Sequence, residues 1–228
     1  MFTMGTGEFK SRVDGVKTRA YVTWSSMKRR CYVSNAVKDK SYKTCEVSDE
    51  WKNFQNFAKW FNDNVTDFCN SIDKDCLVYG NLVYSADTCV MMPMEINAKL
   101  NKLVGKSGVK RAPTGFISKV GFGKKDCYLG FYSSYSMASM VYHYKKSELI
   151  INMAYENKTK LGSKAFCALL EVARRLYETA EQIRLNSAEC MELLPDSSGR
   201  IYRANDTCST IQKTWNDIVP VWSTEKDN

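Results

Sequence analysis

The segment GKSGVKRAPTG, residues 105–115, does most to limit how this chain can fold. It carries three glycines and one proline, which interrupt regular helices and strands, together with three basic side chains. A chain of 228 residues is long enough for one large domain or two small ones. The segment therefore predicts a boundary between two folded parts.

Upstream of this boundary, apolar residues at helical spacing predict two helices. In KTRAYVTWSSMKRRCYV (17–33), the large apolar side chains recur every three or four residues beside a basic face. In CEVSDEWKNFQNFAKWFNDN (45–64), Ser48 is a suitable N-cap and an aromatic stripe follows it. This spacing places three tryptophans in the core rather than on a base-stacking surface: Trp24, Trp51 and Trp60.

The stretch DKDCLVYGNLVYSA (73–86) has the pattern of two short strands. Gly80 and Asn81 separate them, and a Gly-Asn pair tolerates the positive φ angles of a tight turn. Pro93 suits the first turn of a helix, where its missing N–H is harmless. We therefore predict strand, turn, strand and helix between residues 73 and 104.

Downstream of the boundary, the sequence predicts strands followed by helices. Three short β segments are expected at Phe116–Val120, Asp126–Leu129 and Phe131–Tyr132, and a helix is expected to begin at Ser136. SKAFCALLEVARRLYETAEQIRL (163–185) predicts a further helix. The tail after Cys190 contains Trp215 and Trp222 and is expected to pack on something. The predicted fold class is α+β.

Charge favours a polyanionic partner. The chain has 33 Lys and Arg against 25 Asp and Glu, a formal net charge of +8. The basic clusters have two interpretations: their side chains contact phosphates, or they form a surface that only water covers. The residues predicted to contact double-stranded DNA are Lys28, Arg29, Arg30, Lys110, Arg111, Lys119, Lys124 and Lys125.

Cysteine and histidine usage excludes several kinds of site. The nine cysteines form no CxxC pair, so a zinc ribbon is not expected. We expect the cysteines to be buried, reduced thiols. The single histidine, His143, lies within a predicted helix and rules out a site built from several histidines. No apolar leader or membrane-length apolar run is seen, so we expect a cytoplasmic protein with no membrane partner.

The order of motifs in residues 20–100 resembles phage HNH-like endonucleases. The matching stretches are AYVTWSSMKRRCY, VSDEWKNFQNFAKWF, IDKD, Gly-Asn, YSADTC and the asparagine that ends MPMEIN. The resemblance implies a ββα-metal-like module over residues 16–104. It also implies a phage protein located in the host cytoplasm. Three positions depart from the family pattern: Ser48 replaces a cysteine, Ala86 replaces a proline, and Lys74 replaces the histidine.

The same resemblance implies roles for five residues. Asp73 would bind Mg²⁺ or another divalent cation together with Asp75 and Asn97, because hard cations prefer oxygen ligands. Lys74 would replace the histidine as electrophile or base, and Asn81 would order the catalytic loop. In the alternative reading, Asp73 and Asp75 cap a turn and pair with lysine, and no cation is needed.

PTGFIS and YLGFYSSYSMASMVYHYKK resemble the DNA-binding domain of ethylene-response factors. This resemblance implies a three-stranded antiparallel sheet with one packed helix over residues 112–160, followed by a helical extension over 161–228. Two functions follow. One is a metal-dependent homing or nicking endonuclease. The other is a catalytically inactive relative that binds DNA or a host protein, for example as an inhibitor of a host or defence enzyme.

Overall fold

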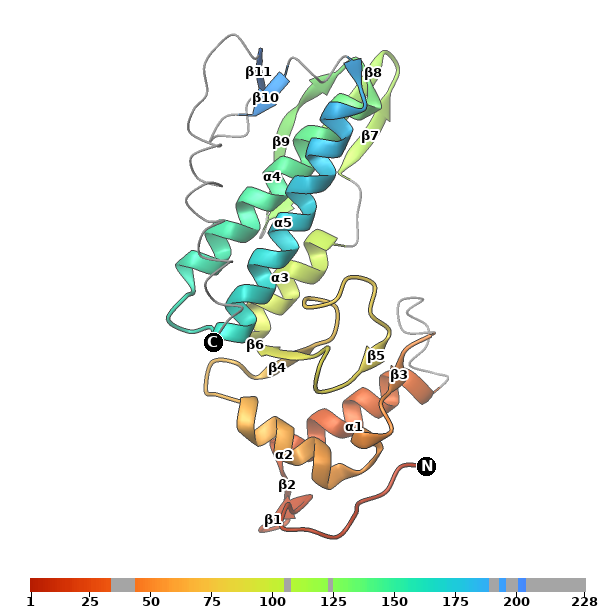
Figure 1. Cartoon of the computed structure of the whole chain (residues 1–228), viewed down its shortest axis with the longest axis vertical. Coiled ribbons are helices and arrows are strands. Elements are labelled where there is room, and N and C mark those ends of the chain that lie inside the picture. The colour runs from red at the N-terminus through yellow and green to blue at the C-terminus, as the bar shows by residue number, and fades with distance from the viewer. Residues whose placement is uncertain (34–43, 105–107, 123–124, 189–192, 196–200, 204–228) are drawn as a thin grey trace. The chain divides into compact units, whose positions relative to one another are not determined.

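The computed structural model describes residues 1–33, 44–104, 108–122, 125–188, 193–195 and 201–203 (Figure 1). It contains both helices and small sheets, so the predicted α+β class is confirmed. The chain divides into two compact units. The first unit is Met1–Ala98 with Met153–Val172, and the second unit is Lys99–Asn152 with Ala173–Asn228. The division passes through three helices, and the modules 16–104, 112–160 and 161–228 stay a prediction.

Helix α1 (Arg19–Tyr32) forms within the predicted range and builds one side of the core of the first unit. The Thr18 side chain caps it by accepting the Tyr21 N–H at 3.4 Å. Trp24 and Met27 are buried, as expected from their helical spacing. The Trp24 indole N–H donates to the Trp51 carbonyl at 2.7 Å, which satisfies its polar atom inside the core.

The helix predicted within 45–64, with Ser48 as its N-cap, is interrupted rather than continuous. Three elements replace it: strand β3 (Glu46–Val47), the 3₁₀ helix η2 (Glu50–Lys52) and helix α2 (Phe54–Asn64). Asn53 causes the break, because its backbone is extended and its side chain caps α2 by accepting the Gln55 N–H at 3.0 Å. Ser48 instead accepts the Trp51 N–H at 3.4 Å and caps the shorter turn.

The aromatic stripe of α2 packs into the same core. Phe54, Phe57 and Phe61 are buried, and Trp51 is fully buried beside them. Trp60 is half-buried and its ring centroid lies 4.6 Å from that of Trp51. The three tryptophans predicted as core residues therefore pack with this cluster.

The predicted pairing in the stretch 73–86 is also wrong, although the turn at Gly80 forms with a φ of 71°. Strand β4 (Ser71–Asp73) pairs antiparallel with β6 (Val90–Met92), and β5 (Val83–Tyr84) pairs parallel with β3. Helix α3 (Met94–Val104) begins directly after Pro93, as predicted. The result is two antiparallel strands, separated by a long loop, followed by a helix.

The second unit contains a three-stranded antiparallel sheet in the order β7-β8-β9. Its strands are β7 (Val109–Ala112), β8 (Gly115–Phe122) and β9 (Lys125–Tyr132). The predicted segments Asp126–Leu129 and Phe131–Tyr132 form the single strand β9, and the third strand, β7, was not predicted and forms inside the segment interpreted as a boundary. The glycines and proline of that segment flank β7 rather than interrupting it.

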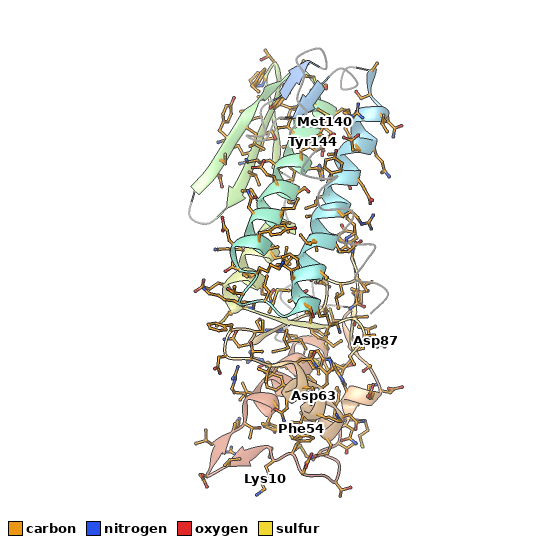
Figure 2. The ribbon with its side chains drawn as sticks, turned by 60° about the vertical axis from the view of Figure 1, so that its left-hand side comes forward. Lys10, Phe54, Asp63, Asp87, Met140 and Tyr144 are labelled. Carbon is orange, nitrogen blue, oxygen red and sulfur yellow. The ribbon has the colours of Figure 1, made fainter. Side chains whose placement is uncertain are left out.

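Helix α4 (Tyr135–Glu156) braces this sheet, which lies beside it in Figure 1. The Ser118 hydroxyl of β8 donates to the Ala138 carbonyl at 2.9 Å, and both residues are buried. Figure 2 labels Met140 and Tyr144, which lie one helical turn apart on α4 and cluster with Ala180 of helix α5 (Ser163–Leu185). The predicted arrangement of a sheet with a packed helix is thus present.

Two short hairpins complete the described elements. β1 (Arg12–Val13) pairs with β2 (Val16–Lys17), and β10 (Leu193–Pro195) pairs with β11 (Ile201–Arg203). The expectations for Cys190, Trp215, Trp222 and Lys124 lie outside the described residues. Within the described residues, no helix is long and apolar enough to cross a membrane.

Candidate functional site

The loop that follows β4 begins with Asp73, whose carboxylate ends the strand. Its Oδ1 accepts the N–H groups of Asp75 and Cys76 at 2.9 and 2.7 Å. Burial raises the pKa of this carboxyl, although these two hydrogen bonds act in the opposite direction. Asp73 therefore caps the turn, and its bonds explain why β4 does not continue into residues 74–79.

Lys74 is buried and its ammonium group is fully engaged. Its Nζ donates to the Asn81 carbonyl at 2.9 Å and forms an ion pair with the Asp75 carboxylate. Burial by itself would lower the pKa of Lys74, but the hydrogen bond and charge of Asp75 outweigh it and raise the pKa. A lysine held in its charged form suits an electrophilic role and does not suit a general base.

Asn81 closes the same loop. Its Nδ2 donates to the carbonyls of Lys74 and Val83 at 2.8 and 2.7 Å, and its Oδ1 accepts the Val83 N–H at 3.1 Å. Lys74 and Asn81 thus bind each other's backbone carbonyls across the loop. Asn81 orders the chain between β4 and β5 through its own side chain.

Asn97 brings helix α3 against β4. Its Nδ2 donates to the Ser71 hydroxyl at 2.9 Å and to the Ile72 carbonyl at 3.3 Å, and only 7% of the residue is exposed. The structure therefore brings Lys74 and Asn81 together in the loop that begins at Asp73, whereas Asn97 bonds to Ser71 and Ile72, the first two residues of β4. Sequence separation alone would not place an α3 side chain beside β4.

The oxygen atoms available here have the chemistry of a hard-cation site, since Asp73 and Asp75 offer carboxylates and Asn97 an amide. Asp75 is partly exposed and already pairs with Lys74. Among the described residues, no group of three or more His, Cys, Asp or Glu side chains forms a metal-binding cluster. The metal ligands Asp73, Asp75 and Asn97 stay a prediction.

The basic cluster of α1 divides into exposed and packed members. Lys28 lies over the rings of Phe2 and Trp24, with its Nζ 4.6 and 4.3 Å from their centroids. Arg29 is exposed, and Arg30 is half-buried. Lys28 therefore contributes to packing of the N-terminal segment, and Arg29 presents its guanidinium group to solvent.

The sheet of the second unit has an outer face, which we define as Lys110, Ile117, Lys119, Tyr128 and Phe131. Cross-strand partners share a face, and the register places Lys110 opposite Ile117, Ile117 opposite Phe131, and Lys119 opposite Tyr128. The opposite face is turned toward α4 at Ser118, whose neighbours in β8 belong to the outer face.

The outer sheet face is exposed and basic. Tyr128 is 59% exposed and Phe131 48% exposed, and Lys110 is exposed as well. The strands contain Lys110, Arg111, Lys119 and Lys125 against the single acid Asp126. Arg111 pairs with Phe116 in the register, so its Cα belongs to the opposite face. The side chain of Lys125 lies outside the described residues.

Sequence reasoning missed three features. Tyr128 and Phe131 are exposed together because of a bulge, which no local pattern reveals. Cys45 is buried and bonds to the Lys74 ammonium, which extends the polar cluster of the first unit. Lys146 of α4 is 4% exposed, and burial lowers its pKa to about 8. A lysine amid apolar helix positions was the only signal available for Lys146.

Two other expected features have ordinary structural positions. His143 lies on α4, and its Nδ1 is 2.7 Å from the Ser139 carbonyl of the preceding turn. Four of the seven described cysteines are buried: Cys45, Cys69, Cys76 and Cys89. A cavity of about 500 Å³ lies between the N-terminal segment, α1 and α2, and none of the predicted site residues lines it.

Comparisons of the chain with family models, with curated proteins and with solved structures find no match.

Proposed function

We propose that the protein binds double-stranded DNA through the outer sheet face of the second unit. The observation that carries this proposal is the presence of two lysines and two exposed aromatic rings on one face of a sheet braced by a helix. Strands of β-ribbons and β-sheets can enter the major groove, where lysines contact phosphates and base edges. The resemblance to ethylene-response-factor domains and the net charge of +8 support the same partner.

The direct experiment measures binding of a short mixed-sequence duplex by fluorescence anisotropy over a series of salt concentrations. Lys110→Gln/Lys119→Gln is expected to weaken binding about tenfold and to reduce the slope of log K against log salt by about two, because each phosphate contact releases about one counterion. Lys10→Gln/Lys160→Gln makes the same charge change at exposed positions of the first unit. Equal losses in both double variants would reject the sheet as the binding surface.

A second candidate is metal-dependent phosphodiester hydrolysis by the first unit. It is supported by the succession of two antiparallel strands, β4 and β6, and helix α3, which is the order of a ββα-metal module, with Asp73 at the end of β4, Lys74 and Asn81 in the loop that follows, and Asn97 on the helix. In such a site, Asp73 and Asn97 would hold the cation, which would activate water. Lys74 would stabilise negative charge, and Asn81 would hold the loop.

Incubation with supercoiled plasmid, with Mg²⁺, with Mn²⁺ and with EDTA, separates cutting from binding. Asp73→Asn is the suitable variant, because an amide oxygen still accepts the two N–H groups while the charge is removed. Metal-dependent nicking that this variant loses would support the endonuclease. Binding without nicking would support the inactive relative, whose target is DNA or a host protein.

A further inference from the structure

The outer sheet face carries more apolar surface than phosphate binding requires. Phe131 and Tyr128 expose about half of their surface, and Ile117 lies between Lys110 and Phe131 in the cross-strand row. Aromatic and branched side chains at the centre of a sheet face are normally covered. Here the described residues leave Tyr128 and Phe131 exposed and Ile117 half-buried, beside lysines that match a polyanion.

A β-bulge creates this apolar centre. The register shifts between Ser118 and Lys119, so Leu129 has no partner and Tyr128 pairs with Lys119. Leu129 packs against the cluster around Met140, and the extra residue brings Tyr128 to the same face as Phe131. Without the bulge, strict alternation would put residues 131 and 128 on opposite faces.

The Phe131 ring reaches across to the neighbouring strand at Gly115. A side chain at Gly115 would meet this ring, because an ideal Cβ there would lie 2.7 Å from Cζ of Phe131. The ring therefore lies over Gly115, and the glycine provides the space.

We propose that the outer sheet face reads the C5 methyl groups of thymine in the major groove. Thymine is the only standard base that presents a methyl group there, and Phe is one of the side chains that contact it. Phe131 and Ile117 make the apolar contact, while Lys110 and Lys119 hold the adjacent phosphates. This inference rests on the proposed DNA binding and names the chemical group that is recognised.

The test compares two duplexes of identical mixed sequence, one with thymine and one with uracil in its place. Uracil lacks only the C5 methyl group, so base pairing and hydrogen-bonding edges are unchanged. We expect the wild-type protein to bind the thymine duplex about fourfold more tightly for each methyl group it contacts, the value of burying one carbon. Equal binding of the two duplexes would overturn the inference and leave DNA binding intact, whereas no binding of either would reject the proposed function.

Variants locate the effect. Phe131→Ala is expected to lower the thymine-to-uracil affinity ratio, because only Ile117 would still contact the methyl groups, and Phe131→Leu is expected to lower it less. Phe68→Ala removes a ring of similar exposure from the first unit and should leave the ratio unchanged. Lys110→Gln should weaken binding to both duplexes equally. A thermal unfolding curve for each variant checks its fold.

A single-stranded oligonucleotide of the same sequence supplies a third arm. Weaker binding of the single strand than of the thymine duplex is expected. Tighter binding of the single strand would overturn the inference, because it would mean that Tyr128 and Phe131 stack on unpaired bases.

Discussion

The loop after β4 in the first unit and the outer sheet face in the second unit differ in how they use their polar residues. In the loop, Asp73 and Lys74 are each 6% exposed. Asp73 accepts backbone N–H groups, and Lys74 donates to the Asn81 carbonyl and pairs with the Asp75 carboxylate. On the sheet, Tyr128 is 59% exposed and Lys110 is exposed too. Polar residues that bond to the backbone stabilise the fold, and those that face solvent are available to a partner. The two regions should therefore respond to substitution in opposite ways.

Asp73→Ala is expected to have the largest effect on stability. It leaves the N–H groups of Asp75 and Cys76 without their acceptor, and the loss should be about 3 kcal/mol in the free energy of unfolding. Chemical denaturation monitored by tryptophan fluorescence measures it. Asp87→Ala, at the exposed residue labelled in Figure 2 between β5 and β6, is the control and should change stability by less than about 0.5 kcal/mol. An Asp73→Ala variant with unchanged free energy of unfolding would contradict the difference between the two regions.

Lys146→Met tests whether the effect of a polar residue on stability depends on its burial and not on the unit in which it lies. Lys146 lies in the second unit, and no described carboxylate forms an ion pair with it, although its Nζ is 4.7 Å from the Tyr142 ring centroid. Burial lowers its pKa from 10.5 to about 8, so the charged form is disfavoured in the folded protein. The substitution should raise stability at pH 7 by about 2 kcal/mol.

The free energy of unfolding should depend on pH through Lys146. Between pH 8 and 10.5 the unfolded chain holds the Lys146 proton that the folded chain has released, so stability from this group rises with pH across that interval. Lys146→Met should remove this rise. Unfolding curves of both proteins at pH 7 and at pH 10 measure the difference, and parallel changes in the two proteins would contradict the assignment.

Asn81→Ala should cost about 1.5 kcal/mol in the free energy of unfolding, because it removes three hydrogen bonds of a partly exposed loop. Asn81→Asp keeps the acceptor for the Val83 N–H but turns a carboxylate oxygen, which cannot donate, toward the carbonyl oxygens of Lys74 and Val83. A loss in Asn81→Asp at least as large as in Asn81→Ala would sharpen the interpretation of the loop as a structural unit, because the two donated bonds would then be the ones that hold it. Equal stability of both variants and the wild type would show that the loop is held by other contacts.

Lys110→Gln should have the smallest effect on stability, within about 0.5 kcal/mol, because its side chain is exposed. The same substitution should weaken DNA binding. Thermal unfolding and anisotropy on one protein preparation measure both quantities. A stability loss as large as that of Asp73→Ala would place Lys110 with the structural residues and remove the difference between the two regions.

Part of the fold could be predicted because it depends on local patterns. Helix α1 and the start of α3 follow from helical spacing and from Pro93. The break at Asn53 was missed, because the aromatic stripe runs across it in sequence and only the cap of α2 reveals it. The loop residues were identified as a group, but nothing local showed that Lys74 is buried.

The sequence by itself determined the α+β class, the main helices, the aromatic core of the first unit and the concentration of positive charge. These depend on composition and on the spacing of neighbours along the chain. Tertiary structure alone decided that β4 pairs with β6, that Lys74 is enclosed between Asp75 and Asn81, and that a bulge brings Tyr128 beside Phe131. Strand register and burial depend on contacts between residues that are distant in sequence. These contacts contribute free energy only once the helices and strands have packed together.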